Sequence, residues 1–203
     1  MKFRSIIYVL ILCVSASAQT PQPASYASAG VTGNFGLNFD PSAVASFELG
    51  IAARPNFFVT ERLEVGTLYK RVWPTPDNGG RSVSSWTDAA FLFESGFLVG
   101  AGFQIANFKG ETVTRFRPTV GYQRLRSSGL PNWEARLTGI LALSDPHRVN
   151  GVEAGVGITH DLGALFFVGV RARTDFLWSE GHHQTFASIQ AQVGINLSAL
   201  KGY

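Results

Sequence analysis

The side chains best suited to catalysis or metal binding in this sequence are histidines that lie close to carboxylates. His182 and His183 follow Glu180, and His147 follows Asp145. A histidine beside a carboxylate can hold a metal ion or act as a general base. The spacing matches no zinc motif, however, and histidines in polar connecting segments are usually only solvated. An enzyme built on this His–acid group is therefore the weakest of the functional hypotheses.

Two other signatures of catalysis, a serine nucleophile and a phosphate-binding glycine motif, also give no support for an enzyme. A serine nucleophile needs a neighbouring base, but the alternation of the last strand-like segment turns Ser188 toward the inner, charged face. The Gly-x-Gly pairs at 100–102 and 155–157 lie inside strand-like segments, and no phosphate-binding glycine motif precedes a helix. We therefore predict that the protein is not an enzyme, has no catalytic residues and needs no metal or cofactor.

The strongest constellation of polar side chains is a set of charges with a two-residue rhythm. Between Trp133 and Leu143 the odd positions are apolar or glycine, whereas Glu134 and Arg136 occupy even positions. This alternation is typical of a β-strand with two different faces. The same rhythm continues along most of the chain and predicts one charged face, made of Glu48, Arg54, Glu64, Lys70, Asp88, Arg115, Arg117, Glu134, Arg136, Glu153, Arg171, Arg173 and Asp175.

The two faces of these segments differ in more than charge. Glycines such as Gly50 and Gly157 share the charged face, where they make room for long side chains in a narrow space. The opposite face is apolar, and no charge interrupts the residues assigned to it. Its members include Val31, Phe47, Leu63, Phe91, Phe103, Leu137, Val156, Val170 and Ile189.

The start of the chain has the features of a secretory signal peptide over residues 1–18. Lys2 and Arg4 precede an apolar run, and small residues at 16–18 fit a cleavage site. Without this segment, which also contains the only cysteine, Cys13, the chain has 15 basic and 14 acidic residues. That balance gives no reason to expect nucleic acid as a partner. Charged residues make up only 15% of the chain, against about 25% in ordinary soluble domains.

A short leader at 19–25 is followed by one domain over 26–203. An exported chain with few charges and no long apolar helix can span a membrane only as a closed barrel. We therefore predict an all-β fold, a transmembrane antiparallel up-and-down β-barrel of about ten strands. Eight strands is the alternative, because the rhythm breaks at 55–62. The predicted strands are 27–39, 43–54, 63–72, 84–93, 97–107, 113–124, 132–143, 151–160, 164–177 and 185–197.

Alternation alone does not tell which face lines the inside of a barrel. A soluble barrel of the lipocalin type would turn its apolar face inward, but its exterior would need many more lysines and glutamates than this chain has. We therefore expect the apolar face to contact lipid and the charged face to line the lumen. Aromatic residues near strand ends are typical of interfacial girdles, and the candidates are Phe39, Trp73, Trp86, Trp133, Trp178, Phe186 and Tyr203.

This pattern resembles the small bacterial outer-membrane β-barrels of the OmpA transmembrane-domain and OmpX type. The most specific feature is the C-terminus, where the odd positions keep the strand phase from Val193 to a terminal aromatic, Tyr203. Lys201 and the tyrosine in place of phenylalanine depart from the family pattern. The resemblance implies an outer-membrane location in a Gram-negative bacterium, contact with outer-membrane lipids, and assembly by the barrel-assembly machinery. It leaves the oligomeric state open.

The charged lumen admits two functional hypotheses besides the rim enzyme. The interior of a barrel of about eight strands is just filled by side chains, so paired charges would form a plug in a structural or interaction protein. Alternatively, the charges would line a narrow pore for ions or small solutes. The plug is the favoured interpretation, because a charge confined in a narrow lumen needs a partner.

Overall fold

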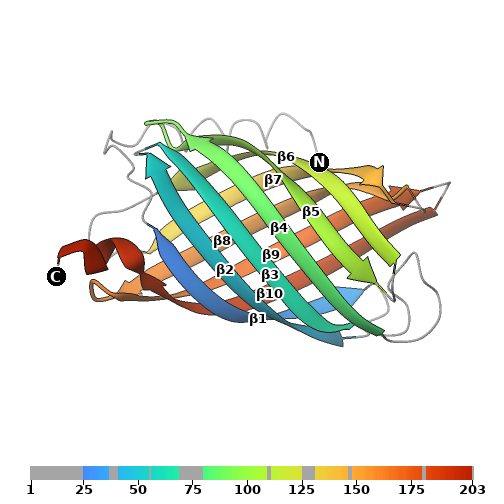
Figure 1. The fold of residues 1–203 in the computed structure, drawn as a ribbon, viewed down its shortest axis with the longest axis horizontal. Helices are drawn as coiled ribbons and strands as arrows, with labels where there is room; N and C mark the ends of the chain where they lie inside the picture. The colour runs from blue at the N-terminus through green and yellow to red at the C-terminus, as the bar shows by residue number, and fades with distance from the viewer. Residues whose placement is uncertain are drawn as a thin grey trace, which may run out of the picture.

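The computed structural model describes residues 25–36, 41–54, 56–68, 80–108, 111–124, 131–145, 148–179 and 182–202. These residues form ten strands and one short 3-10 helix (Figure 1). The predicted signal peptide at 1–18 lies outside these residues. The strands are β1 (Tyr26–Gly36), β2 (Pro41–Arg54), β3 (Phe57–Leu68), β4 (Gly80–Leu92), β5 (Phe97–Phe108), β6 (Glu111–Arg124), β7 (Asn132–Ser144), β8 (Asn150–Leu162), β9 (Phe166–Ser179) and β10 (His182–Asn196), and the helix is η2 (Leu197–Gly202).

The strands close into a single antiparallel up-and-down barrel. Each strand pairs with its neighbours in sequence, and β1 closes the sheet by pairing with β10, from Tyr26 opposite Asn196 to Gly36 opposite Phe186. Closure leaves no free sheet edge, so every strand has a partner on both sides. The predicted fold and the count of ten strands are confirmed, and the alternative of eight strands is wrong.

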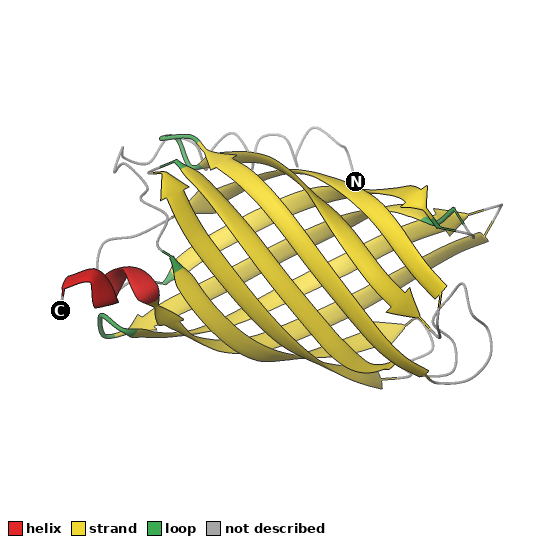
Figure 2. Cartoon of the chain, in the orientation of Figure 1, coloured by secondary structure: helices red, strands yellow, loops and turns green. Residues whose placement is uncertain are grey.

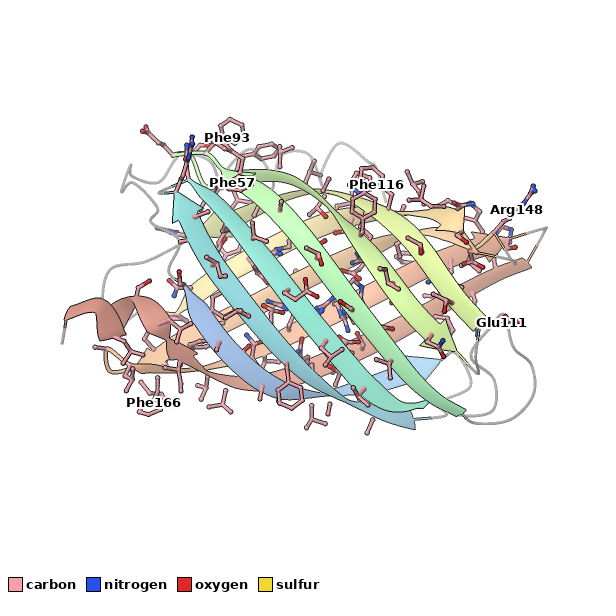
Figure 3. The ribbon with its side chains drawn as sticks, in the orientation of Figure 1. Phe57, Phe93, Glu111, Phe116, Arg148 and Phe166 are labelled. Carbon is pink, nitrogen blue, oxygen red and sulfur yellow. The ribbon has the colours of Figure 1, made fainter. Side chains whose placement is uncertain are left out.

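The two faces of the wall have the predicted orientation. On the outside, Leu137 is 50% exposed and Val156 is 58% exposed, whereas the lumen residue Arg117 is only 4% exposed. Figure 3 shows Phe116 and Phe166 projecting outward from the wall. A largely apolar exterior around a polar interior is the arrangement of a transmembrane barrel, and it rejects the soluble, lipocalin-like alternative.

The two ends of the barrel differ in their connections. The start of β1, the end of β10 and the tight turns after β4 and β8 lie at one end, to the left in Figures 1 and 2. Gly96 and Gly163 adopt positive φ in these two turns, a conformation that favours glycine. Among the described residues, no helix is long and apolar enough to cross a membrane.

Three details of the sequence prediction are corrected. The C-terminal segment does not stay in strand phase, because η2 begins at Leu197; Tyr203 lies outside the described residues. Trp86 is not part of a girdle, since it is 6% exposed and lies inside the barrel. Phe186 is also on the inner side, at the same parity as the buried Ser188.

Two of the predicted girdle aromatics do lie on the outer face. Trp178 is exposed near the end of β9, and Trp133 packs beside Tyr122 near the start of β7, with ring centroids 5.3 Å apart. Phe39 and Trp73 are outside the described residues. The wall therefore carries exterior aromatics at both ends, as expected at the two membrane interfaces.

The segment at 55–62, which was predicted to break the strand rhythm, belongs mostly to β3. The strand begins at Phe57, and an irregularity in the pairing of β2 with β3 falls between Ala52 and Arg54. The alternation therefore continues back from Leu63 to the start of the strand. This extension places Glu61 on the outer face and Arg62 on the inner face.

Candidate functional site

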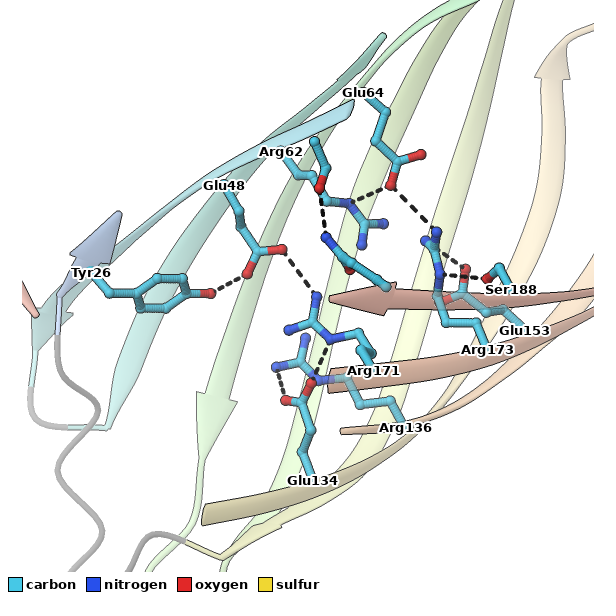
Figure 4. A network of polar contacts seen from close by, with 12 residues as sticks. Tyr26, Glu48, Arg62, Glu64, Glu134, Arg136, Glu153, Arg171, Arg173 and Ser188 are labelled. Carbon is cyan, nitrogen blue, oxygen red and sulfur yellow. Dashed lines mark hydrogen bonds and ion pairs between the residues drawn. The ribbon is translucent and has the colours of Figure 1, made fainter. Parts of the chain in front are cut away.

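The lumen holds the largest cluster of charged side chains in the described structure, and the pleat of the strands places them there. Since successive side chains point to opposite faces of a strand, Glu134 and Arg136 on β7 enter the lumen together, as do Arg171 and Arg173 on β9. Their partners come from strands on other parts of the wall. Two chains of contacts result, which we call the first and the second lumen chain (Figure 4).

The first lumen chain runs from β1 and β2 across to β7. The Tyr26 hydroxyl donates a hydrogen bond to Glu48. The Arg171 guanidinium reaches both Glu48, at 3.1 Å from Nη1 to Oε2, and Glu134, at 3.0 Å from Nε to Oε1. Arg136 completes the chain at 2.7 Å from Nη2 to Glu134 Oε2. One arginine thus joins carboxylates from two separate strands.

The second lumen chain runs from β3 to β9, β8 and β6. Arg173 joins Glu64, at 3.4 Å from Nη2 to Oε1, to Glu153, at 4.0 Å from Nη1 to Oε2. Arg62 lies 3.6 Å from Glu64, and Arg117 lies 3.0 Å from Glu153. Every arginine in this chain therefore has a carboxylate neighbour, which is what a buried charge requires.

Both chains cross the full width of the barrel. In the strand order, four strands separate β2 from β7 in either direction, and the same is true of β3 and β8. Glu48 and Glu134 in the first chain, and Glu64 and Glu153 in the second, therefore stand on opposite walls and are joined through an arginine of β9. The contacts are bridges across the lumen rather than pairs along one wall.

A separate ion pair lies nearer the end of the barrel where β5 and β7 end. Arg115 on β6 holds Asp145 at 2.9 Å from Nη2 to Oδ2, and its Nε also donates to Oδ2. Asp145 is buried. Its carboxylate is thus engaged by Arg115, and His147, the nearest histidine in the sequence, lies outside the described residues.

The predicted His–acid rim site is only partly within the described structure. His183 is exposed, whereas Glu180 and His147 lie outside the described residues, as does the placement of the His182 side chain. Within the residues that the structure describes, no three His, Cys, Asp or Glu side chains come together as metal ligands.

Most of the predicted lumen residues are joined by ion pairs. The other four do not form one group, because some face inward, one is exposed and one lies outside the described residues. Asp88 and Asp175 face inward, and one oxygen of each has no hydrogen-bond partner among the described residues. Arg54 is exposed at the end of β2, beyond the irregularity in its pairing. Lys70 lies outside the described residues. The paired members are Glu48, Glu64, Arg115, Arg117, Glu134, Arg136, Glu153, Arg171 and Arg173.

Sequence reasoning missed Arg62 and Tyr26 as parts of this network. Arg62 stacks over the Trp86 ring at 4.6 Å and is 7% exposed, so a cation–π contact holds it in the lumen. Its parity with Glu64 would have revealed it if the strand had been extended to Phe57. No sequence signal marks Tyr26, because its role depends on reaching Glu48 on the adjacent strand.

The glycines of the inner face provide the space for these side chains. A Cβ on Gly50 would lie 2.2 Å from the Tyr26 ring, and one on Gly157 would lie 3.1 Å from Glu134 Cγ. Any larger residue at Gly50 would displace the tyrosine that binds Glu48. The glycine pattern seen in the sequence therefore has the predicted cause, at least at these two positions.

The space left in the lumen is small. A cavity of about 140 Å³ lies near the end that carries the barrel termini, lined among others by Tyr26 and Phe167. A second cavity, of about 50 Å³, is lined by residues of the second lumen chain. Glu134, Arg136 and Arg171 line both cavities, so the first lumen chain stands between them. On the wall of β3–β5, Phe58, Ala90, Leu92 and Leu98 fill the interior with a buried apolar cluster.

Comparison with known proteins finds no matching family and no matching curated protein. The solved structures it resembles are outer-membrane barrels. The translocator domain of the autotransporter NalP from Neisseria meningitidis is 10% identical with a TM-score of 0.48, and the match covers 95% of each chain. Neisserial surface protein A is 11% identical with a TM-score of 0.39, covering 85% of this chain and 95% of that one.

The N-terminal β-barrel domain of Pseudomonas aeruginosa OprF gives a similar result, with 10% identity, a TM-score of 0.36, and coverage of 85% of this chain and 99% of that one. All three TM-scores are below 0.5 and all three identities are 11% or less, so the lumen is interpreted from its own residues.

Proposed function

We propose that this protein is an integral outer-membrane β-barrel whose lumen is closed by ion-paired side chains, and that it has a structural or interaction role. It is not an enzyme in this proposal. Its partners are the lipids around its apolar wall and, during biogenesis, the barrel-assembly machinery. A cleaved signal peptide at 1–18 would supply the route of export.

The observation that carries the proposal is the crossing of the lumen by two chains of ion pairs. Arg171 and Arg173 each connect carboxylates on opposite walls. A solute that passed through would have to separate these partners in a confined space, and leaving one buried charge unpaired costs about 3–5 kcal/mol. A continuous conduit would instead need charges that face an open, hydrated path.

The test is single-channel recording in planar bilayers, combined with unfolding of the same protein in lipid vesicles. We expect little native conductance. Glu134→Ala removes the carboxylate shared by Arg136 and Arg171, so it should lower the unfolding free energy while the conductance stays small. Glu94→Ala, in an exposed turn, is the matched control and should change neither quantity.

The opposite result would identify a pore. A large native conductance, with an ion selectivity that changes in Glu134→Ala while stability is kept, would reject the plug. In that case the cavity of about 140 Å³ would be the entrance to a narrow path for ions or small solutes.

A further inference from the structure

The larger of the two lumen cavities extends to the end of the barrel that carries the barrel termini. Its lining includes Tyr26 at the start of β1, Asn132 at the start of β7 and Asn196 at the end of β10. Its lining also includes Glu134 and Arg171 of the first lumen chain. We call this space of about 140 Å³ the terminal cavity. The mouths of β-barrels are among the places where small-molecule sites preferentially occur.

Aromatic rings form part of the wall of the terminal cavity. Tyr26 and Phe167 lie edge to face with ring centroids 5.8 Å apart, and Phe58 also lines the cavity. Phe58 and Phe167 are buried. The inner face keeps room for these rings, because a Cβ on Gly194 would lie 2.2 Å from the Phe167 ring. The rings offer a bound molecule an apolar surface that gains free energy when it is removed from water.

Two polar side chains of the lining have a buried atom without a hydrogen-bond partner. Gln192 is 8% exposed, and its Oε1 accepts no hydrogen bond from the described residues. Arg136 contacts Glu134 through Nη2, but its Nε donates to none of the described residues. Both side chains line the terminal cavity. Since buried polar atoms are nearly always hydrogen-bonded, a molecule bound here should supply a donor to Gln192 and an acceptor to Arg136.

The charges in the lining of the terminal cavity balance one another. The acidic residues of this lining are Glu134 and Asp161, and the basic residues are Arg136 and Arg171. Glu134 contacts both arginines, and Arg171 also contacts Glu48. An ion that entered the cavity would therefore find no unpaired opposite charge at its inner side, and taking an ion out of water without one is costly. The balance favours an uncharged ligand.

A molecule with several hydroxyl groups meets these conditions. Each hydroxyl carries no charge and both donates and accepts hydrogen bonds, so a single type of group suits Gln192 and Arg136 alike. The C–H surface of a sugar ring can lie against Tyr26 and Phe167, whereas water would leave these rings wetted. A cavity of about 140 Å³ has room for about ten water molecules, and a hexose has a similar number of non-hydrogen atoms.

We propose that the terminal cavity binds a neutral, hydroxyl-rich molecule of the size of one hexose unit. Its hydroxyl groups donate to Gln192 and accept from Arg136, and its C–H surface packs against Tyr26 and Phe167. The molecule enters and leaves through the same end of the barrel, so it does not have to separate the first lumen chain. This inference goes beyond the proposed function and does not depend on whether the lumen conducts.

The first test compares molecules of one size and different charge by calorimetric titration of the folded protein, in an amine-oxide detergent that carries no sugar. Glucose, galactose and mannose are the neutral probes, gluconate is the anion and glucosamine is the cation. The best neutral hexose should have a dissociation constant at least about ten-fold lower than either ion. Tighter binding of gluconate or glucosamine, or no binding of any neutral hexose, would overturn the proposal.

The second test places the binding in the terminal cavity. Gln192→Met keeps the length of the side chain but removes its hydrogen-bonding atoms, so it should raise the dissociation constant of that hexose at least about ten-fold. Thr159→Phe, which fills the cavity from β8, should weaken binding at least as much. Gln104→Met is the matched control, because Gln104 is also buried but does not line this cavity. Heat-dependent gel mobility confirms that each variant is folded.

The affinities of the variants decide whether the site is assigned correctly. Wild-type affinity in both Gln192→Met and Thr159→Phe, or an equal loss in Gln104→Met, would show that the hexose binds elsewhere. A disaccharide of the same hexose then separates two sources of the ligand. Similar affinity for the disaccharide assigns the cavity to the end unit of a longer glycan, whereas a loss of at least about ten-fold assigns it to a free sugar.

Discussion

The inner and outer faces of the same strands differ in whether their side chains are charged and ion-paired or apolar. On β3, the inward Arg62 and Glu64 lie in a chain of ion pairs, while the outward Leu63 and Val65 are apolar and exposed. The difference follows from what each face can contact. The closed lumen brings partners from the opposite wall within reach, whereas the exterior offers a side chain only its immediate neighbours and lipid.

The position of a carboxylate on the wall, and not its residue type, therefore decides whether an arginine lies close enough to stabilise it. Glu153 in the lumen has two arginines nearby, at 3.0 and 4.0 Å. Glu61 on the outside has two hydroxyl groups. A charge introduced on the outer face should therefore be costly, and a partner removed from the inner face should be more costly still.

The largest effect is expected inside the barrel. Glu153→Ala leaves Arg117 and Arg173 with one carboxylate partner fewer, and removing one member of a buried ion pair costs about 3–5 kcal/mol. Urea unfolding in lipid vesicles measures the change. Glu94→Ala is the control, because Glu94 is exposed in a turn. Similar stabilities for the two variants would mean that the lumen charges are hydrated individually and not paired.

A charge added to the outer face should have the next largest effect. Leu137 is 50% exposed in the lipid-facing set, and Leu137→Arg should destabilise the barrel by about 2–4 kcal/mol, the range for arginine at the bilayer midplane. The same unfolding assay measures it, with Leu137→Met as an apolar control. If the arginine variant matched the methionine variant, this wall would not face hydrocarbon.

Crowding on the inner face gives a third, smaller effect. A Cβ at Gly50 would lie 2.2 Å from the Tyr26 ring, whereas at Gly155 the nearest atom would be 3.6 Å away. Gly50→Ala should therefore cost about 1–3 kcal/mol, as overpacking does, and Gly155→Ala should cost much less. Equal costs would show that strand propensity, and not the space required by Tyr26, selects glycine.

The smallest effect is expected from an outer hydrogen bond. Ser85→Ala removes one donor to Glu61 and should destabilise the barrel by about 0.6 kcal/mol, the average for hydrogen bonds between side chains within membranes. Val83→Ile, on the same face of β4, is the control and should be close to neutral, because it keeps an apolar β-branched side chain in a strand. A loss as large as that of Glu153→Ala would remove the distinction between the two faces.

Much of the fold was readable from the sequence. The alternation around Leu137 predicted the strand and its lipid-facing side, and the structure has Glu134 and Arg136 on the inner face. These inferences succeed because the pleat is a local property with a period of two residues. The predicted strand at 63–72 begins too late, because β3 starts at Phe57. The two-residue rule therefore left Arg62 out of the lumen set and Glu61 out of the outer face, where it is exposed.

By itself, the sequence determined which residues form strands and which side chains share a face, since both depend on neighbours along the chain. Only the tertiary structure decided that Arg171 joins Glu48 to Glu134, that Tyr26 caps this chain, and that Trp86 lies under Arg62. The Tyr26–Glu48 and Arg62–Trp86 contacts join adjacent strands, whereas the Arg171 contacts join strands that face one another across the lumen. Closure of the barrel, and not any local pattern, makes these bridges across the lumen possible.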